Sequence, residues 1–426
     1  MWEVRSDSGN IYSIYFEPSR NIWRCNCKGF RIYGTECKHI GFVKKEVVND
    51  MVKISDLSGI EKDHLKGLIA AGYNKLSIVA DAKSEDVAKA SGATVTQAQK
   101  WIAEARYLIA DQSIIFRSGE GMIKHKEETV KLISTGSSYL NSILGGGVPT
   151  DCTTLITGGF GTGKTQICMQ LAVNTVCDLR RKAVYLITEA STVPPERMLQ
   201  MAVLGKGFVP KGYNAERLSS KVSGFSDVNI TVDEAKEIMK NFKGIFNWGV
   251  ESVNPWDSDF ILVDPASLRT PEKVVKALEQ TEKRIEEDKL DIGIICIDSF
   301  TSLLREAYAG RGSLSDRGKT LSSLTQVMQR LASVHNLAVV STGQVYGNPD
   351  EQMSSRSIRK FGMKETPWGG EYFLHSWAYQ ISLSLIKGGL STKEIWRAYT
   401  YDCPVPRKTA NFYIRPEGII DAPQET

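Results

Sequence analysis

Short apolar runs recur in the second half of the chain and alternate with longer segments in which apolar residues repeat at helical spacing. The runs 151–157, 182–189, 292–297 and 336–344 are rich in β-branched residues and have the length of buried strands. The segment 166–176, directly after the first run, is apolar over several turns and predicts a buried helix. This alternation predicts an α/β fold with a mainly parallel sheet, in which ligands bind at the carboxyl ends of the strands.

The first 112 residues follow other patterns. Residues 8–27 alternate like a hairpin around Asn21, and residues 38–48 have helical spacing. Residues 51–112 twice place a Gly, at Gly59 and Gly92, before a segment of helical periodicity. A hairpin between two helices frees backbone N–H groups that can hold a phosphate. The alternative is a small helical bundle that serves only packing.

Composition limits the class of protein. The 426 residues favour two or three domains, and 42% hydrophobic with 24% charged residues exclude wholesale disorder and fibrous architectures. The net charge of +4 is too small to identify a partner. We find no secretory signal and no apolar run long enough for a membrane helix. Five scattered Cys in apolar stretches favour reduced thiols, so we expect a cytoplasmic protein without membrane contact.

The other three Cys are clustered near the N-terminus. The pattern is Cys25-x-Cys27, nine residues, then Cys37-x-His39. Three thiolates and one imidazole are the ligands of a closed, structural tetrahedral Zn²⁺ site. The pattern resembles the SWIM zinc finger, a ββα module, which we place at residues 1–50. The alternative is a set of ordinary core cysteines, and whether the module binds DNA or protein stays open.

A glycine-rich loop between the first predicted strand and its helix carries the most specific motif. It fits the pattern G-x-x-x-x-G-K-[ST], in which glycines let backbone N–H groups approach phosphate oxygens. Lys164 would neutralise the β- and γ-phosphates of ATP, and the Thr165 hydroxyl would bind Mg²⁺. The residues of this predicted nucleotide site are Gly158, Gly159, Phe160, Gly161, Thr162, Gly163, Lys164, Thr165 and Gln166.

Three polar side chains stand at the ends of the other predicted strands. Asp298 ends the run 292–297 and would hold Mg²⁺ through water. Glu189 would position or deprotonate the attacking water, and the Gln344 amide would sense the γ-phosphate. Either of the last two, taken alone, could be an ordinary exposed residue at a strand end.

Several motifs in order resemble archaeal RadA, a branch of the RecA family: STGSSYLNSILGGGVPT, GGFGTGKTQ, PERM, IDSFTSLLREAYAGRGSLSDR, GQVYGNPD and WGGEYFLHS. The helical segment resembles the helix-hairpin-helix lobe of the same proteins. The resemblance implies a RecA-type core that binds ATP and forms filaments on single-stranded DNA, or assists proteins that do. It also implies that Lys164 and Thr165 grip the nucleotide, that Asp298 is the Walker-B aspartate, and that Glu189 is the catalytic glutamate.

The resemblance further implies two DNA-binding loops. Arg305, Tyr308 and Arg311 fall in the first loop. The second spans about 349–370 and carries four cations beside Phe361, a composition suited to gripping phosphates and stacking a base. These cations are Arg356, Arg359, Lys360 and Lys364. A mobile surface loop would have a similar composition.

The chain departs from the family pattern at several positions. Gly159 replaces a Glu, Pro194 replaces the Arg that packs against adenine, and Gly343 replaces an Asn. The Phe-x-x-Ala oligomerisation motif reads Phe116 to Gly119, which costs the contact about 1 kcal/mol for the lost methyl group. An insertion near 205–260 is rich in aromatic residues, which would form a partner surface or, as we favour, a small subcore.

We therefore expect a zinc finger at 1–50, a helical lobe at 51–112, a linker with the oligomerisation segment at 113–130, and an ATPase core at 131–426. The first hypothesis is a single-stranded-DNA-dependent ATPase of recombinational repair, as a RadA paralogue and homo-oligomer. The alternative is a non-catalytic mediator that binds ATP and a partner recombinase. A signalling ATPase of the circadian-clock type shares the core, but the GRG loop and helical lobe argue against it.

Overall fold

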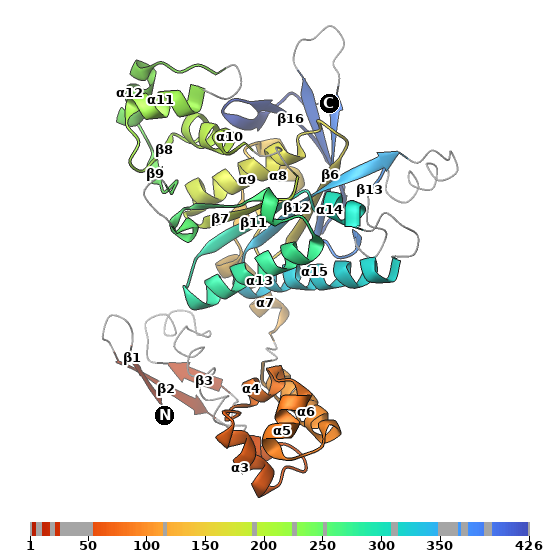
Figure 1. Cartoon of the computed structure of the whole chain (residues 1–426). Helices are drawn as coiled ribbons and strands as arrows, with labels where there is room; N and C mark the ends of the chain where they lie inside the picture. The colour runs from red at the N-terminus through yellow and green to blue at the C-terminus, as the bar shows by residue number, and fades with distance from the viewer. Residues whose placement is uncertain are drawn as a thin grey trace. The chain divides into compact units, whose positions relative to one another are not determined.

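The computed structural model describes residues 2–5, 11–17, 22–25, 54–113, 117–189, 194–223, 228–249, 254–307, 314–347, 365–367, 374–386 and 394–424. The chain divides into two compact units, residues 1–122 and 123–426 (Figure 1). The division falls inside α7 (Gly119–Thr129), within the segment 113–130 that the sequence predicts as a linker. Among the described residues, no helix is both long and apolar enough to cross a membrane.

The first unit begins with a three-stranded antiparallel sheet. It contains β1 (Trp2–Arg5), β2 (Ile11–Glu17) and β3 (Ile22–Cys25), in the order β1-β2-β3. The antiparallel pairing of β2 with β3 confirms the predicted hairpin. Cys25 ends β3, whereas Cys27, Cys37, His39 and the predicted helix at 38–48 lie outside the described residues. The zinc site therefore stays a prediction.

Residues 54–113 of the first unit are helical, as the sequence predicts. The elements are η2 (Ile54–Asp56), α3 (Lys62–Ala70), α4 (Leu76–Asp81), α5 (Ser84–Ser91) and α6 (Val95–Ser113). Their core contains the fully buried Trp101, whose Nε1 donates to the Ser58 carbonyl at 3.0 Å. Gly59 and Gly92 both have left-handed backbone conformations, which glycine adopts without strain. The turns before α3 and α6 thus follow directly from these two glycines.

A ten-stranded mixed sheet forms the centre of the second unit. The strand order is β10-β7-β11-β12-β6-β14-β15-β16-β17, and β13 pairs with β12. The strands from β10 to β14 run parallel, and those from β14 to β17 run antiparallel. This order confirms the predicted α/β fold with a mainly parallel sheet.

The strands of this unit are β4 (Leu132–Ile133), β5 (Val148–Pro149), β6 (Thr153–Gly158), β7 (Lys182–Ile187), β8 (Phe208–Pro210), β9 (Gly244–Phe246), β10 (Phe260–Val263), β11 (Ile292–Asp298), β12 (Ala338–Gly347), β13 (Glu365–Pro367), β14 (Tyr379–Ile386), β15 (Ile395–Asp402), β16 (Thr409–Arg415) and β17 (Gly418–Asp421). The helices are α8 (Ser138–Ile143), α9 (Lys164–Leu179), α10 (Pro195–Gln200), η3 (Met201–Gly205), α11 (Ala215–Ser223), α12 (Val232–Lys240), η4 (Pro255–Asp257), η5 (Pro265–Ser267), α13 (Pro271–Glu287), α14 (Phe300–Ala307) and α15 (Leu314–His335).

Helices cover both faces of the sheet, and the side chains of β11 show why. Ile294 and Cys296 join the apolar cluster around α9, whereas Ile295 and Ile297 join the cluster around α13 and α15. Successive side chains of a strand point to opposite faces, so a strand that is apolar at every position needs a helix layer on each side. Figure 1 shows α9 on one face and α13 with α15 on the other.

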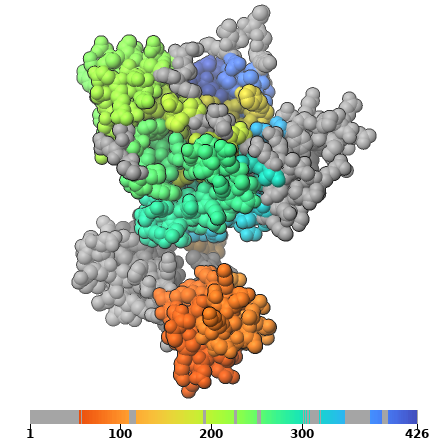
Figure 2. Space-filling view, viewed as in Figure 1, coloured from red at the N-terminus to blue at the C-terminus, as the bar shows by residue number. Residues whose placement is uncertain are grey.

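The predicted insertion forms a small lobe beside α10, seen in yellow-green in Figure 2. It contains the parallel pair β8–β9 with α11 and α12. Phe208, Tyr213 and Phe246 are buried there in one cluster with the residues of α9, whereas Phe242 is exposed. The buried aromatic residues of the insertion therefore extend the apolar cluster around α9, and a separate subcore stays a prediction.

Candidate nucleotide-binding site

The glycine-rich loop joins β6 to α9 and has no room for side chains at its two ends. A Cβ on Gly158 would lie 2.6 Å from the Leu383 carbonyl oxygen. A Cβ on Gly163, the residue before α9, would lie 2.7 Å from Ile414 Cδ1, and its φ of 89° is left-handed. Glycine is required at both positions because neighbouring strands approach the loop so closely.

Lys164 and Thr162 fold back onto the same loop. The Lys164 Nζ donates to the carbonyl oxygens of Gly158 and Gly159, at 2.9 and 2.7 Å. Thr162 Oγ1 also donates to the Gly159 carbonyl, at 2.9 Å. The ammonium therefore lies at the loop, at the N-terminal end of α9, where a helix favours negative charge. Phe160, at the tip of the loop, is fully exposed.

A cavity of about 1010 Å³ opens over this loop and brings the predicted residues together. Its volume is at the upper end of the range for small-molecule sites and accommodates a nucleoside triphosphate. The lining residues that the sequence predicts are Gly158, Gly159, Phe160, Gly161, Thr162, Gly163, Lys164, Thr165, Gln166, Glu189, Asp298 and Gln344. They are joined by Arg197, Val228, Trp396, Arg415 and Pro416, among others.

Asp298 is the last residue of β11 and is almost fully buried. Burial raises the pKa of its carboxyl, although hydrogen bonds from Thr342, Thr165 and Tyr185 act in the opposite direction. The Tyr185 hydroxyl donates to Oδ2 at 2.9 Å. The nearby charge of Glu189 raises the pKa of Asp298 further. A divalent cation would favour the ionised carboxyl here, so Asp298 and the Thr165 hydroxyl fit a Mg²⁺ site.

Glu189 and Gln344 meet at the edge of the cavity. Gln344 Nε2 donates to Glu189 Oε1 at 3.3 Å. Glu189 lies two residues beyond the end of β7, and Gln344 lies in β12; these two strands are not adjacent, because β11 lies between them. Gln344 stands within β12, opposite Gly158, and not at its end, because β12 continues to Gly347 and pairs with β13. The sequence placed this residue correctly beside the loop but ended the strand too early.

Arg197 was missed as a site residue, although it stands in the PERM motif. It is only 4% exposed, and burial lowers the pKa of its guanidinium to about 10. It donates to Gln166 Oε1 at 2.9 Å and to the carbonyl oxygens of Arg415 and Pro416, both at 2.5 Å. The guanidinium therefore joins α9 and α10 to the turn between β16 and β17, which forms one wall of the cavity.

Trp396 was also missed, and it holds the glycine-rich loop from the other side. Its Nε1 donates to the Gly161 carbonyl at 3.3 Å, and its ring lies against Gly163. Trp396 belongs to β15, 235 residues from Gly161 along the chain. No local signal in the sequence marks such a residue, because its role depends on the pairing of β14 with β6 and with β15.

Comparisons with known proteins agree with this geometry. Residues 125–206 and 261–422, more than half of the chain, match the protein family described as Rad51. The chain belongs to the Rad51 family. It is also 28% identical, over 375 residues, to the DNA repair and recombination protein RadA of Metallosphaera sedula. That alignment covers 87% of this chain and 95% of the relative.

Rad51-family proteins are RecA-type ATPases of homologous recombination and DNA repair that bind single-stranded DNA and form filaments. The two predicted DNA loops of this Rad51-family chain begin beyond the carboxyl ends of β11 and β12. Arg305 lies in α14, whereas Tyr308 and Arg311 lie outside the described residues. Part of the predicted second loop, 349–370, is a strand, since β13 lies within this range and pairs antiparallel with the end of β12. Its predicted contacts, Arg356, Arg359, Lys360 and Lys364, also lie outside the described residues.

The oligomerisation segment is described only in part. Gly119 is the first residue of α7, and Phe116 lies outside the described residues. A Cβ on Gly119 would meet no atom within 4 Å. Packing within the described part of the chain therefore leaves room at Gly119 for the methyl group that the motif has at this position.

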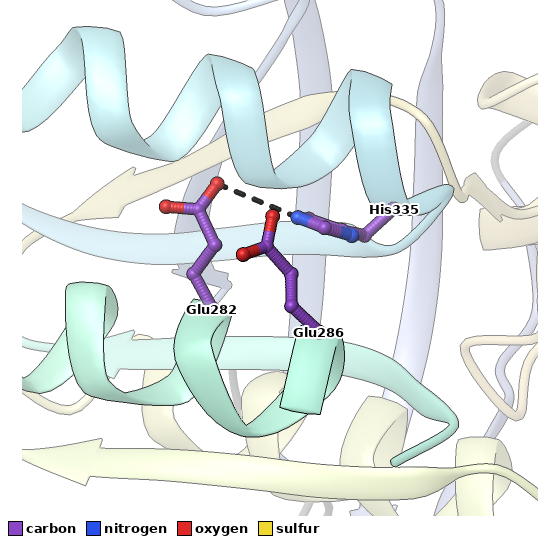
Figure 3. Close-up of side chains that lie close together, drawn as sticks. All are labelled: Glu282, Glu286 and His335. Atoms are coloured by element: carbon purple, nitrogen blue, oxygen red, sulfur yellow. Dashed lines mark hydrogen bonds and ion pairs between the residues drawn. The ribbon is translucent and has the colours of Figure 1, made fainter. Parts of the chain in front are cut away.

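A second group of ionisable side chains lies between α13 and α15, shown in Figure 3. Ligand atoms of Glu282, Glu286 and His335 lie within 4.8 Å of one another. Arg330 donates to both carboxylate oxygens of Glu282, from Nε at 2.8 Å and from Nη2 at 2.5 Å. This bond is the main reason that the pKa of Glu282 is lowered. Because Arg330 holds both oxygens, we interpret the group as an ion-pair network that ties the two helices together.

Proposed function

We propose that this chain is an ATP-dependent, single-stranded-DNA-binding protein of homologous recombination and repair that hydrolyses ATP in response to DNA. The observation that carries the proposal is the single cavity that gathers Lys164, Thr165, Asp298, Glu189 and Gln344 around a glycine-rich loop. Chance would not bring five such residues together from three strands and one helix. Membership of the Rad51 family supplies the nucleic-acid substrate.

Each residue has a distinct task in this proposal. The loop amides and Lys164 bind the β- and γ-phosphates, and Arg197 keeps the opposite wall in place. Bound Mg²⁺ supplies charge neutralisation between the phosphates. Thr165 and Asp298 would hold it there. Glu189 accepts a proton from the attacking water, and Gln344, hydrogen-bonded to Glu189, changes its contact when the γ-phosphate departs.

The link from hydrolysis to DNA runs through β12. Gln344 lies three residues before the end of this strand, from which the second DNA loop leaves. A shift of Gln344 would therefore move the base of that loop, where β12 pairs with β13. ATP binding would favour the DNA-binding loop conformation, and hydrolysis would release DNA.

The test is the rate of ATP hydrolysis with and without single-stranded DNA. We expect stimulation by DNA in the wild type and loss of hydrolysis in Lys164→Ala. Lys273→Ala is the matched control, because Lys273 is an exposed lysine of α13 outside the cavity. Equal rates with and without DNA in the wild type would contradict the proposal.

The proposal also covers the first unit, residues 1–122. We infer that Cys25, Cys27, Cys37 and His39 hold Zn²⁺ in a SWIM-type module, and that residues 51–112 act as a helix-hairpin-helix lobe. Both would dock DNA or protein onto the ATPase core at 131–426. Cytoplasmic location, inferred from reduced thiols, is part of the same proposal.

The second candidate is a mediator that binds ATP and a partner recombinase without fast turnover. Three observations favour it over the principal recombinase. Residues 207–260 fall between the two stretches that match the Rad51 family. Glycine replaces larger side chains at Gly159, Gly343 and Gly119. The relative is only 28% identical. Strand exchange by the purified chain alone, with no retention of a co-expressed recombinase in a pull-down, would rule the mediator out.

A further inference from the structure

A second cavity, of about 250 Å³, lies between α10 and the insertion lobe. Glu196 and Leu199 of α10 line one side. Tyr213, Arg217, Lys221 and Trp248 of the lobe line the other. The lobe residues fall in the segment 207–260, which lies between the stretches matched to the Rad51 family. This cavity, which we call the insertion pocket, is therefore built largely from residues outside the stretches that match the Rad51 family.

The insertion pocket carries two cations without acidic partners in the described part of the chain. Arg217 and Lys221 are one helical turn apart on α11, so they project from the same face. Among the described residues, no ion pair involves either cation, and Glu196 is the only carboxylate that lines the pocket. Like charges at this spacing disfavour a helix, and an anion between them would relieve the repulsion.

The acidic residues of the neighbouring helix α12 are engaged elsewhere. Asp233 pairs with Lys236 at 2.8 Å. Glu234 accepts from the backbone N–H and hydroxyl of Thr231 at the start of α12, and Glu237 accepts from Asn241. These carboxylates are therefore engaged within α12, and Glu216 of α11 does not line the pocket.

Aromatic rings form the rest of the lobe's surface in the pocket. The Arg217 guanidinium lies over the Tyr213 ring, 4.5 Å from its centroid. The Trp248 ring packs edge-on against Phe246 and Phe260, with centroid distances of 5.6 and 5.1 Å. These contacts hold Trp248 rigidly, so its orientation costs little entropy when a ligand binds. Rigid rings beside paired cations are the elements that bind a base together with its phosphate.

We propose that the insertion pocket holds one nucleotide of a DNA single strand, with the base against Trp248 and the phosphate between Arg217 and Lys221. The proposal rests on the proposed function only for the identity of the ligand. It adds a DNA contact separate from the two loops beyond β11 and β12. An acidic peptide would satisfy the two cations but would leave the aromatic face without a planar partner.

The pocket also has a direct connection to the nucleotide site. Glu196 and Leu199 face the insertion pocket from the same helix, α10, that carries Arg197 into the ATP cavity. A strand held in the pocket would therefore contact the helix that supports the wall of the ATP cavity. Binding at either site would restrain the same element.

The test measures oligo-dT binding by fluorescence anisotropy at several salt concentrations. Arg217→Ala/Lys221→Ala is compared with Lys240→Ala/Lys243→Ala, which removes two exposed cations of the same lobe outside the pocket. Loss of the one phosphate contact should lower the slope of log affinity against log salt by about 0.7 in the pocket variant. The control variant should keep the wild-type slope. Thermal melting of both variants checks that they fold.

A second measurement locates the base. Oligo-dT that carries 5-iododeoxyuridine is crosslinked to the full chain by ultraviolet light, and the modified peptides are mapped. We expect crosslinks at Trp248 or Tyr213, and their loss in the pocket variant.

Three outcomes overturn the proposal. The first is equal slopes in the two variants without a crosslink in 205–249. The second is competition by a polyglutamate peptide for the pocket while both variants bind oligo-dT alike. These two leave the proposed function intact. A wild type that binds no oligo-dT at all would overturn both proposals together.

Discussion

Replacing Arg197 by Met should lower both the stability of the second unit and its affinity for ATP. Met keeps the length of the aliphatic stem, so the change removes the guanidinium without opening a large cavity. In the native chain this guanidinium donates to the side-chain oxygens of Gln166 and Gln200 and to the carbonyl oxygens of Arg415 and Pro416. The variant leaves these acceptors without their donor.

The magnitude follows from the number and burial of these acceptors. A buried acceptor that loses its donor costs roughly 1–3 kcal/mol. Gln200 is fully buried, and the two carbonyl groups border the cavity, where water can partly replace the guanidinium. Gln166 also lines the cavity. We take the lower end for each of the four acceptors, or about 4 kcal/mol in total. For a unit of about 300 residues this corresponds to a fall in Tm of about 6 °C.

The functional effect should accompany the loss of stability. Arg415 and Pro416 line the ATP cavity, so a displaced wall should weaken ATP binding, by about tenfold if 1.4 kcal/mol of the loss is felt there. Arg197→Lys keeps the charge but not the planar fork, and should recover only part of both quantities. Differential scanning calorimetry and titration with labelled ATP measure the two effects.

The matched control is Arg269→Met, because Arg269 is an exposed arginine outside the cavity. It should change neither Tm nor ATP affinity. If Arg197→Met melts within about 1 °C of the wild type and binds ATP equally well, the wall does not depend on this guanidinium and the reasoning fails.

Four further predictions follow from single residues. Asp298→Asn should abolish ATP hydrolysis without lowering Tm, because burial raises the pKa of this carboxyl and the neutral amide avoids that cost; a lower Tm would contradict this. Glu282→Gln should lower Tm at pH 7 and lower it less at pH 4. The Arg330 bond lowers the pKa of Glu282 below its ordinary 4.5, so the stability that this bond provides is lost as pH falls through the folded-state pKa. An equal fall in Tm at both pH values would refute this. Cys37→Ser should lower the Zn²⁺ bound per chain in metal analysis, and unchanged zinc would exclude Cys37 as a ligand. Gly119→Ala restores the methyl group of the oligomerisation motif and should tighten self-association about fivefold in sedimentation equilibrium, whereas unchanged association would mean that the motif is not used.

The phosphate-binding loop could be predicted because all its determinants are close together in the sequence. Gly158, Gly163, Lys164 and Thr165 lie within eight consecutive residues, between a strand-like run and a helix-like run. Strand–loop–helix geometry then places the amides and the ammonium without help from the rest of the chain. Asp298 was identifiable for a similar reason, since it ends an uninterrupted apolar strand.

Other residues of the site could not be predicted from local sequence patterns. The Arg197 guanidinium acquires its role only because the turn after β16 returns to α10 from more than 200 residues away. The insertion pocket likewise depends on α11 lying beside α10, which the aromatic composition of the lobe did not indicate. The aromatic content of the insertion favoured buried side chains, but it did not separate the buried Phe246 from Trp248, which is packed on one side and lines a cavity on the other.

The sequence by itself determined the α/β class and the glycine-rich loop between β6 and α9, because both depend on neighbouring positions and on intrinsic backbone preferences. Only the tertiary structure decided which residues share a cavity. The strand order β7-β11-β12-β6-β14-β15 brings Glu189, Asp298, Gln344 and Trp396 around one loop. That order is set by the burial of two apolar layers over the whole unit, and no local stretch of sequence contains it.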